Sequence, residues 1–179
     1  MTAKAFIICA PSGTGKTTIA RAWIEKEKSL VLSISHTTRK PRLAESNGKD
    51  YHFVSEETFK RLEREGVFLE TAEVFGNFYG TSKNWIQGKI SEGFNILLEI
   101  DVQGAAQVRD ELPNTVSIFI LPPSLGELRS RLIQRNQDSE EVIARRLAAL
   151  ERELAHINSF DYAIINPVSY THLTLPTKA

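Results

Sequence analysis

Short apolar runs alternate with segments of helical periodicity along most of the chain. Apolar runs without polar alternation are typical of strands that are buried on both faces of a parallel sheet. Such runs lie at residues 6–9, 31–34, 95–100, 115–121 and, in a shorter form, 161–165. Because helical segments separate most of these runs, the pattern predicts an α/β protein with a parallel sheet. Ligands of such sheets bind at the carboxyl ends of the strands.

A long stretch between the second and third of these runs has elements of its own. Strand-like pieces lie at residues 51–54 and 68–75, and helical pieces lie at residues 55–65 and 82–92. Because these pieces form a block between two core strands, they predict a subdomain inserted into a core. The predicted bounds are residues 1–34 and 94–166 for the core and residues 35–93 for the inserted subdomain.

Two amphipathic helices follow the fourth apolar run. Leu125, Leu128 and Leu132 share one face of the first helix. The apolar positions of the second, which Asp138 or Ser139 would cap, are Ile143, Leu147, Leu150, Leu154 and Ile157. We expect the polar link at residues 136–139 to be mobile. Residues 167–179 carry two prolines, no acidic residue and no clear period, which predicts an atypical tail, such as a truncation joined to unrelated sequence.

Composition narrows the class of protein. The chain has 179 residues, of which 41% are hydrophobic, and it carries 22 basic and 22 acidic residues. A chain with balanced charge lacks the overall positive electrostatic potential that attracts nucleic acid or an anionic membrane. Any anion-binding site must therefore be a local cluster of residues. The single cysteine, Cys9, and the absence of a membrane-length apolar stretch predict a cytoplasmic protein without disulfides. The four histidines lack metal-ligand spacing, and the oligomeric state stays open.

The strongest motif is the stretch "APSGTGKTT", which lies between the first strand and the first helix. Glycines in this setting let main-chain amides turn toward a phosphate, while Lys16 reaches the outer phosphates and Thr17 offers a hydroxyl to Mg²⁺. Ala10 stands where the strict P-loop pattern has glycine. An ordinary glycine-rich turn is the alternative. The predicted phosphate-binding residues are Ala10, Pro11, Ser12, Gly13, Thr14, Gly15, Lys16, Thr17 and Thr18.

A basic cluster, "SHTTRKPR", opens the inserted subdomain at residues 35–42. Arg39 and Arg42 lie three residues apart beside hydroxyl side chains, and Tyr51 and Tyr79 could add phenolic donors from the same subdomain. Guanidinium groups match the oxygens of a phosphate dianion. A solvated basic loop is the alternative if the cluster is considered alone.

Five motifs together resemble the guanylate kinase family: "APSGTGKTT", "SHTTRKPR", "NGKDYHF", "FLETAEVFGNFYGT" and "LLEIDVQG", in this order. The resemblance runs from about residue 5 to residue 166. It implies an α/β, three-layer P-loop core with a parallel sheet, an inserted nucleotide-monophosphate-binding subdomain and a helical lid at about residues 126–150. It also implies ATP and Mg²⁺ as cofactors and GMP as the phosphate acceptor.

The same resemblance assigns the acceptor site residue by residue. Residues implied to hold the GMP phosphate are Ser35, Arg39, Arg42, Tyr51 and Tyr79, and residues implied to read the base are Glu70, Thr81 and Asp101. The second group makes physical sense, because guanine presents donors at N1 and N2 where adenine presents an acceptor at N1. Carboxylates would therefore pair with guanine and leave buried groups unpaired against adenine, which costs ~1 to 3 kcal/mol for each lost hydrogen bond.

The predicted reaction transfers the γ-phosphoryl group of MgATP to a GMP oxygen that is already anionic, so catalysis needs alignment and charge neutralisation. Arg131 and Arg135 share a helix face, and Arg146 comes from the next helix, as expected for arginines of a closing lid; solvated arginines are the alternative.

The metal role of Glu99 and the role of Asn166, a candidate neighbour of adenine, stay open. Two other functions remain possible at this point: a catalytically inactive protein-binding module of the same fold, and a related sugar-phosphate kinase.

Overall fold

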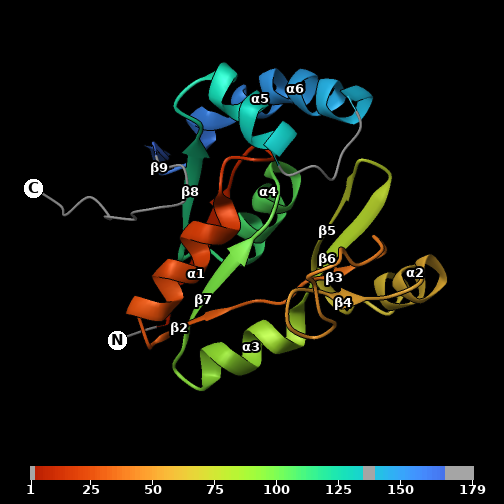
Figure 1. Cartoon of the computed structure of the whole chain (residues 1–179). Helices are drawn as coiled ribbons and strands as arrows, with labels where there is room; N and C mark the ends of the chain where they lie inside the picture. Colours follow the sequence, from red (N-terminus) through yellow and green to blue (C-terminus); the bar gives the residue numbers. More distant parts are fainter. Residues whose placement is uncertain (1–2, 135–139, 168–179) are drawn as a thin grey trace, which may run out of the picture. The chain divides into compact units, whose positions relative to one another are not determined.

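The computed structural model describes residues 3–134 and 140–167. The chain divides into two compact units, of which the first comprises Met1–Ile7 with Ser29–Val116 and the second Ile8–Lys28 with Ser117–Ala179. Strand β1 (Ala5–Cys9) begins in the first unit and ends in the second. Figure 1 shows the order of the elements along the chain.

In the first unit, a parallel sheet has the strand order β2-β7-β1. Strand β2 (Leu30–Leu32) pairs in parallel with β7 (Asn95–Glu99), in a register that sets Leu30 opposite Asn95. Ile96, Leu97 and Leu98 of β7 are fully buried, which explains why this strand is an unbroken apolar run. Helix α3 (Lys83–Ser91) packs against β7, and helix α4 (Val102–Glu111) comes after β7 in the chain.

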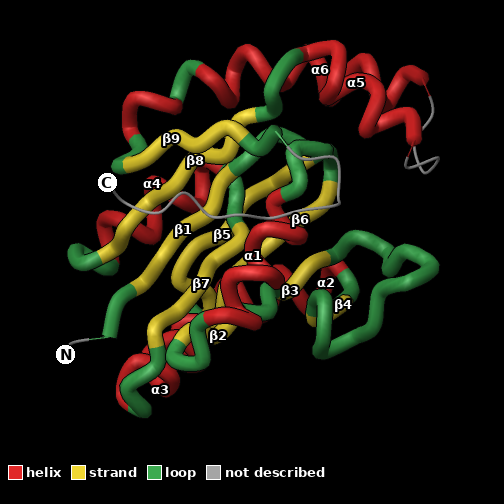
Figure 2. The backbone as a smooth tube through the Cα atoms, turned by 60° about the vertical axis from the view of Figure 1, so that its left-hand side comes forward, coloured by secondary structure: helices red, strands yellow, loops and turns green. Residues whose placement is uncertain are grey.

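The first unit also holds a second sheet, with the strand order β4-β3-β6-β5. Its strands are β3 (His36–Thr37), β4 (His52–Phe53), β5 (Phe68–Val74) and β6 (Asn77–Ser82). Strands β5 and β6 form the antiparallel hairpin seen in Figure 2, and its turn places Phe75 and Gly76 at positive φ angles of 49° and 75°. Helix α2 (Glu56–Arg64) begins after Ser55, whose hydroxyl accepts a hydrogen bond from the Thr58 amide as its N-cap.

Most elements expected in this sheet and its helices are confirmed, and two strands were missed. Strands β4 and β5 and helices α2 and α3 lie within the predicted segments. Strand β3 has only two residues, and β6 reads "NFYGTS", which contains a glycine and no apolar alternation. Such strands are defined by their partners in the sheet, because their own residues carry too little pattern.

The second unit has the strand order β1-β8-β9, in which β8 (Thr115–Leu121) and β9 (Tyr162–Ile165) are parallel. Its helices are α1 (Lys16–Lys26), α5 (Leu125–Gln134), α6 (Glu140–Leu154) and the short 3₁₀ helix η1 (Ile157–Ser159). Leu128 and Leu132 of α5 pack with Ile143 and Leu150 of α6 in one buried cluster, which confirms most of the predicted apolar faces. The prediction was wrong for Leu125, which opens α5 and is 64% exposed.

The predicted end of the last long helix was wrong. Helix α6 ends at Leu154, and Ile157 belongs to η1, whose tighter turn breaks the α-helical period. The proposed caps Asp138 and Ser139, the link at residues 136–139, and residues 168–179 of the predicted tail lie outside the described residues.

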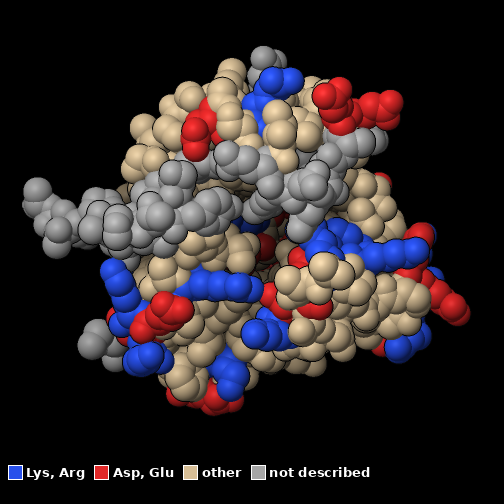
Figure 3. Space-filling view, viewed as in Figure 1, with Lys and Arg blue, Asp and Glu red and all other residues tan. Residues whose placement is uncertain are grey.

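Charge is mixed over the surface. Figure 3 shows lysine and arginine side chains interspersed with aspartate and glutamate side chains on the face drawn, in keeping with the equal counts of the two kinds. Within the described residues, none of the helices has both the length and the apolar character needed to cross a membrane.

Candidate nucleotide sites

The predicted phosphate loop connects β1 to α1 in the second unit. Gly13 and Gly15 have φ angles of 90° and 94°, and the Thr14 amide donates to the Pro11 carbonyl at 3.2 Å, which closes a tight turn. Gly15 is the N-cap of α1 and offers no side chain to the first turn. The amides at the start of a helix lack helical partners, so this turn can offer donors and a positive dipole end to a phosphate.

Both glycines are also required by space. A Cβ atom on Gly13 would lie 2.9 Å from Cδ2 of Leu132, and one on Gly15 would lie 2.6 Å from Nδ2 of Asn166. Positive φ angles already disfavour any other residue at these positions. Helix α5 and the residue that follows β9 therefore fix where the loop runs.

Asn166 is a support of the phosphate loop that sequence reasoning missed. Its side-chain Nδ2 donates to the Thr14 carbonyl at 2.8 Å, and its main-chain amide donates to the Leu121 carbonyl at 2.8 Å. Thr14 is fully buried and Asn166 is 6% exposed. An asparagine after a short strand gives no sequence signal for this contact, because its partner lies 152 positions earlier in the chain.

Of the remaining cationic and metal-binding candidates in the second unit, the structure describes only some side chains. Lys16 opens α1, and Thr17 is exposed on the first turn of the same helix. Arg135 lies outside the described residues, and the side chains of Arg131 and Arg146 do as well, although their main chains belong to α5 and α6.

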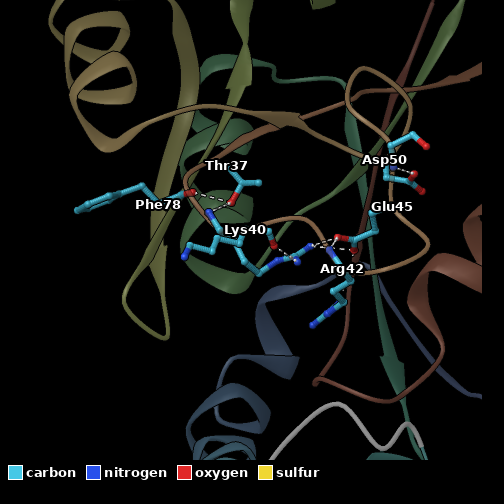
Figure 4. A network of polar contacts seen from close by, with 8 residues as sticks. Thr37, Lys40, Arg42, Glu45, Asp50 and Phe78 are labelled. Atoms are coloured by element: carbon cyan, nitrogen blue, oxygen red, sulfur yellow. Dashed lines mark hydrogen bonds and ion pairs between the residues drawn. The ribbon is translucent and has the colours of Figure 1, made fainter.

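In the first unit, the predicted phosphate-binding arginines converge on Glu45. Nη2 of Arg39 donates to both carboxylate oxygens of Glu45, at 2.8 and 2.9 Å, while Nη1 donates to the Lys40 carbonyl at 2.8 Å. The Arg42 amide donates to Oε2 of Glu45 at 2.8 Å, and Nη1 of Arg42 lies 3.6 Å from Oε1. Figure 4 shows Arg42 and Glu45 within this network.

Aromatic rings complete the surroundings of Arg39. Its guanidinium carbon lies 5.3 Å from the centre of the Tyr51 ring and 5.9 Å from that of Phe53, and the rings of Tyr51 and Tyr79 are 5.9 Å apart. The Arg39 side chain is only 16% exposed, whereas Lys40 and Pro41 beside it are exposed. The structure therefore brings three of the predicted phosphate ligands, Arg39, Tyr51 and Tyr79, together.

The charges of the cluster stabilise one another. Burial alone would raise the pKa of Glu45, but hydrogen bonds from Arg39 and from the Arg42 amide bring that pKa below its ordinary value. Burial likewise opposes the charged form of Arg39, whereas the contacts with Glu45 and Tyr79 raise the pKa of Arg39. Sequence reasoning missed Glu45, because a single carboxylate in a polar loop resembles an ordinary solvated residue.

The two threonines of the basic cluster hold its backbone in place. The Thr37 hydroxyl donates to the Phe78 carbonyl at 3.0 Å and accepts from the Arg39 amide at 3.2 Å, while the Phe78 amide donates to the Thr38 hydroxyl at 2.9 Å. Figure 4 shows Thr37 facing Phe78. Strand β3 is thereby tied to β6. The rings of His36 and His52 lie in a tilted arrangement with their centres 4.7 Å apart, and burial, followed by the charge of His52, lowers the pKa of His36.

A second group in the first unit joins Ser35, Thr81 and Glu70. The Thr81 hydroxyl donates to Oε1 of Glu70 at 2.6 Å, and the Ser35 and Thr81 hydroxyl oxygens are 3.3 Å apart. Because a hydroxyl has one proton, Ser35 is the donor in the second bond. All three side chains are buried, with 8%, 0% and 3% of their surface exposed. The structure thus places Ser35, predicted to hold phosphate, beside two predicted base readers.

Asp101 completes this group from the start of α4. Its Oδ1 accepts from the Gly104 amide at 2.9 Å and its Oδ2 accepts from the Gln103 side chain at 3.2 Å, so Asp101 is the N-cap of α4. A Cβ atom on Gly104 would lie 2.4 Å from Oε2 of Glu70 and 3.4 Å from Oδ1 of Asp101. The two predicted base-reading carboxylates therefore flank the same glycine. Oε1 of Glu99 is buried without a hydrogen-bond partner within the described part of the chain.

A parallel α/β sheet with a glycine-rich loop between its first strand and first helix defines a P-loop nucleotide-binding protein. Comparison with known proteins narrows this class. The family model "Guanylate kinase" matches residues 2–169. A guanylate kinase of Thiobacillus denitrificans is 52% identical over 161 residues, which cover 90% of this chain and 77% of that protein. A guanylate kinase of Dechloromonas aromatica is 53% identical over 166 residues, which cover 93% and 82%.

A solved structure agrees with these relatives. The crystal structure of guanylate kinase from Anaplasma phagocytophilum matches with a TM-score of 0.77 and 38% sequence identity, over 92% of this chain and 77% of that one. The chain belongs to the guanylate kinase family, whose members are ATP:GMP phosphotransferases. The predicted family, the mixed α/β fold with a parallel sheet and the predicted enzyme class are confirmed.

Proposed function

We propose that this chain transfers the γ-phosphoryl group of MgATP to GMP and releases ADP and GDP. The observation that carries the proposal is the acceptor region of the first unit, where a fixed guanidinium cluster and a buried carboxylate group occur within one sheet and its neighbouring loop. The first suits a phosphate dianion and the second suits a base that presents donors. Residues 35–93 would then form most of the GMP-binding subdomain.

The donor nucleotide is assigned to the phosphate loop of the second unit. The loop at residues 10–18 would surround the phosphates of ATP with main-chain N–H groups from residues other than Pro11, and Lys16 would neutralise charge on the outer phosphates. Arg131, Arg135 and Arg146 are proposed to add positive charge around the transferring group, from a helical lid at about residues 126–150. Closure of such a lid would exclude water, which could otherwise accept the phosphoryl group.

Thr17 is the residue proposed to hold Mg²⁺. Its side chain is exposed on the first turn of α1, and hydroxyl oxygens are ligands that Mg²⁺ accepts beside water and phosphate oxygens. When bound, the ion would neutralise phosphate charge during transfer. The chain's own contribution is to place Lys16 and Thr17 together in the first turn of α1, directly after the phosphate loop.

In the acceptor site, no general base is needed. The attacking oxygen of GMP is already anionic at neutral pH, so the protein has only to align it and screen its charge. The residues proposed to do so at the phosphate are Ser35, Arg39, Arg42, Tyr51 and Tyr79. Glu70, Thr81 and Asp101 are proposed to accept or relay the hydrogen bonds of N1 and N2 of guanine.

A coupled assay of ADP release tests the proposal, with GMP, AMP, dTMP and ribose 5-phosphate offered as acceptors. We expect turnover with GMP and a strong preference for it. Lys16→Met should abolish this turnover, while Lys28→Met, which changes an exposed lysine outside the proposed sites, should leave it unchanged. Absence of turnover in the wild type would favour a binding module, and turnover without a guanine preference would favour a sugar-phosphate kinase. A cytoplasmic location stays a prediction from the sequence.

A further inference from the structure

Strand β5, which carries Glu70, is the last strand of its sheet. In the order β4-β3-β6-β5, it has a strand neighbour on one side only among the described residues. The register of its pairing with β6 shifts between Phe68 and Glu70. An edge strand with an irregularity at one residue is not fixed in place by its sheet alone. Within the sheet, the Glu70 carboxylate accepts a hydrogen bond from Thr81 of β6 at 2.6 Å, and contacts from outside the sheet add to this support.

Helix α4 supplies a substitute partner for this edge. The Gln107 side chain donates through Nε2 to the Thr71 carbonyl at 2.8 Å and accepts at Oε1 from the Thr71 amide at 3.1 Å. One primary amide thus satisfies both main-chain groups of the residue that follows Glu70, as a neighbouring strand would. Helix α4 packs against β5 along this contact.

Gly104, one turn earlier in α4, makes room for the carboxylate itself. A Cβ atom there would lie 2.4 Å from Oε2 and 3.1 Å from Cδ of Glu70. Gly104 is helical and has no positive φ angle, so space rather than backbone conformation requires glycine at this position. Residues three apart in a helix lie on one face, so Gly104 and Gln107 both face β5.

We propose that Gly104 and Gln107 are positioning residues for guanine recognition, with Gln107 fixing the main chain beside Glu70 and Gly104 fixing the place of its carboxylate. This inference rests on the proposed function, in which Glu70 accepts hydrogen bonds from the base. Neither residue needs to touch the nucleotide. Their effect is on the choice of base, because a displaced carboxylate no longer meets the N1 and N2 donors together.

The test compares GMP with IMP, whose base lacks the N2 amino group, in steady-state assays of the full chain. Gln107→Ala should raise KM for GMP about tenfold, leave KM for ATP and kcat at saturating GMP within about twofold, and reduce the preference for GMP over IMP, as expected when orientation but not chemistry is lost. Gln107→Glu keeps the acceptor for the Thr71 amide but sets a carboxylate against the Thr71 carbonyl, so its effect should be at least as large.

Gly104→Ala should have the largest effect on the preference for GMP over IMP, because its Cβ displaces Glu70 directly. Gln87→Ala is the matched control, since it removes an exposed glutamine from α3, and it should change none of these constants. If Gly104→Ala does not fold, Gln107→Ala carries the test alone.

Three outcomes overturn the inference. One is a folded Gln107→Ala variant with an unchanged ratio of kcat/KM between GMP and IMP. The second is an equal loss for both acceptors and for ATP together with a lower melting temperature, which would show a merely structural role. The third is a wild type without GMP turnover, which removes the proposed function and this inference with it; the first two leave the proposed function intact.

Discussion

The two regions proposed to bind phosphate groups are built in different ways. The loop after β1 uses main-chain geometry, with two glycines at positive φ and walls formed by Leu132 and Asn166. The cluster around Glu45 uses side chains, with Arg39 and Arg42 held by one carboxylate. Binding at the loop should therefore be sensitive to any added atom, whereas binding at the cluster should be sensitive to changes of charge and pH.

The largest effect is expected from Gly15→Ala. Alanine at a φ angle of 94° is strained, and its Cβ would lie 2.6 Å from Nδ2 of Asn166. Because a displacement of about 1 Å at a reacting site can cost ~100-fold in rate, kcat/KM for ATP should fall on the order of 100-fold. Gly88→Ala is the control, since nothing lies within 4 Å of its Cβ position and it lies inside α3.

The double variant Gly15→Ala/Asn166→Ala separates the two causes. Asn166→Ala removes the atom that the new Cβ would meet, so partial recovery relative to Gly15→Ala would assign the loss to space. No recovery would assign the loss to the backbone angle. Full activity of Gly15→Ala itself would contradict the account of the loop as a main-chain site.

Arg39→Lys should have the next largest effect, and it acts on the other region. Lysine keeps the charge but cannot bond both oxygens of Glu45 and the Lys40 carbonyl with one planar group. Since hydrogen bonds to charged groups contribute about 1.5 to 3 kcal/mol, KM for GMP should rise roughly 10- to 100-fold with KM for ATP unchanged. Steady-state titration of each substrate measures both constants. Arg64→Lys, at the exposed end of α2, should have no effect.

Asn166→Ala alone should have a moderate effect that is mainly structural. It removes the donor to the buried Thr14 carbonyl, and an unsatisfied buried carbonyl costs about 1 to 3 kcal/mol. The melting temperature should fall by several degrees, and KM for ATP should rise a few-fold because the loop loses one of its supports. A thermal melt beside a titration of ATP checks both, with the exposed Asn114→Ala as control. An unchanged melting temperature would contradict the assigned role.

The smallest effect concerns pH and the ion pair of Glu45. Its folded pKa is lowered, so its contribution to stability is complete above the unfolded value of about 4.5 and is lost as the pH falls below that value. At neutral pH, Glu45→Gln should therefore unfold with a free energy about 1 kcal/mol lower than the wild type. The difference in unfolding free energy between the two proteins should shrink toward zero as the pH falls below about 4.5.

Chemical denaturation at a series of pH values measures that difference. His36, whose pKa is lowered, also costs stability as the pH falls below 6.5, but it is present in both proteins and cancels in the comparison. A constant difference between the wild type and Glu45→Gln at all pH values would show that the carboxylate of Glu45 contributes through its shape rather than its charge.

The two regions also differ in how far they could be predicted from the sequence. The loop is contiguous, so its glycines, Lys16 and Thr17 define it within nine positions between a strand and a helix. Its support by Asn166 could not be predicted, because that contact depends on how the end of β9 meets the loop. In the cluster, the arginines were predicted but Glu45 was not, since only the folded loop shows that the Arg39 guanidinium and the Arg42 amide both donate to it.

The group proposed to read the base shows this limit of prediction more strongly. Ser35, Glu70 and Thr81 join in one buried chain of hydrogen bonds, although Ser35 and Thr81 are separated by 46 positions. Resemblance to a family assigned these residues, and no spacing rule could have done so. The long apolar runs predicted β1, β7 and β8 well, whereas β3 and β6 depend on neighbours for their pairing. Local pattern therefore predicts the buried strands, and tertiary contacts determine the polar groups.

The two roles of Asp101, the observed N-cap of α4 and the proposed reader of the base, limit how this protein can evolve. The same carboxylate begins α4 and stands beside the residue that faces Glu70, so a change at position 101 that alters base choice also removes a helix cap. Selection in the laboratory for a new acceptor base should thus accumulate changes first at Thr81, a proposed base reader in β6 on which no helix cap depends. Asp101 should change late, after other substitutions have made the helix tolerant of its loss.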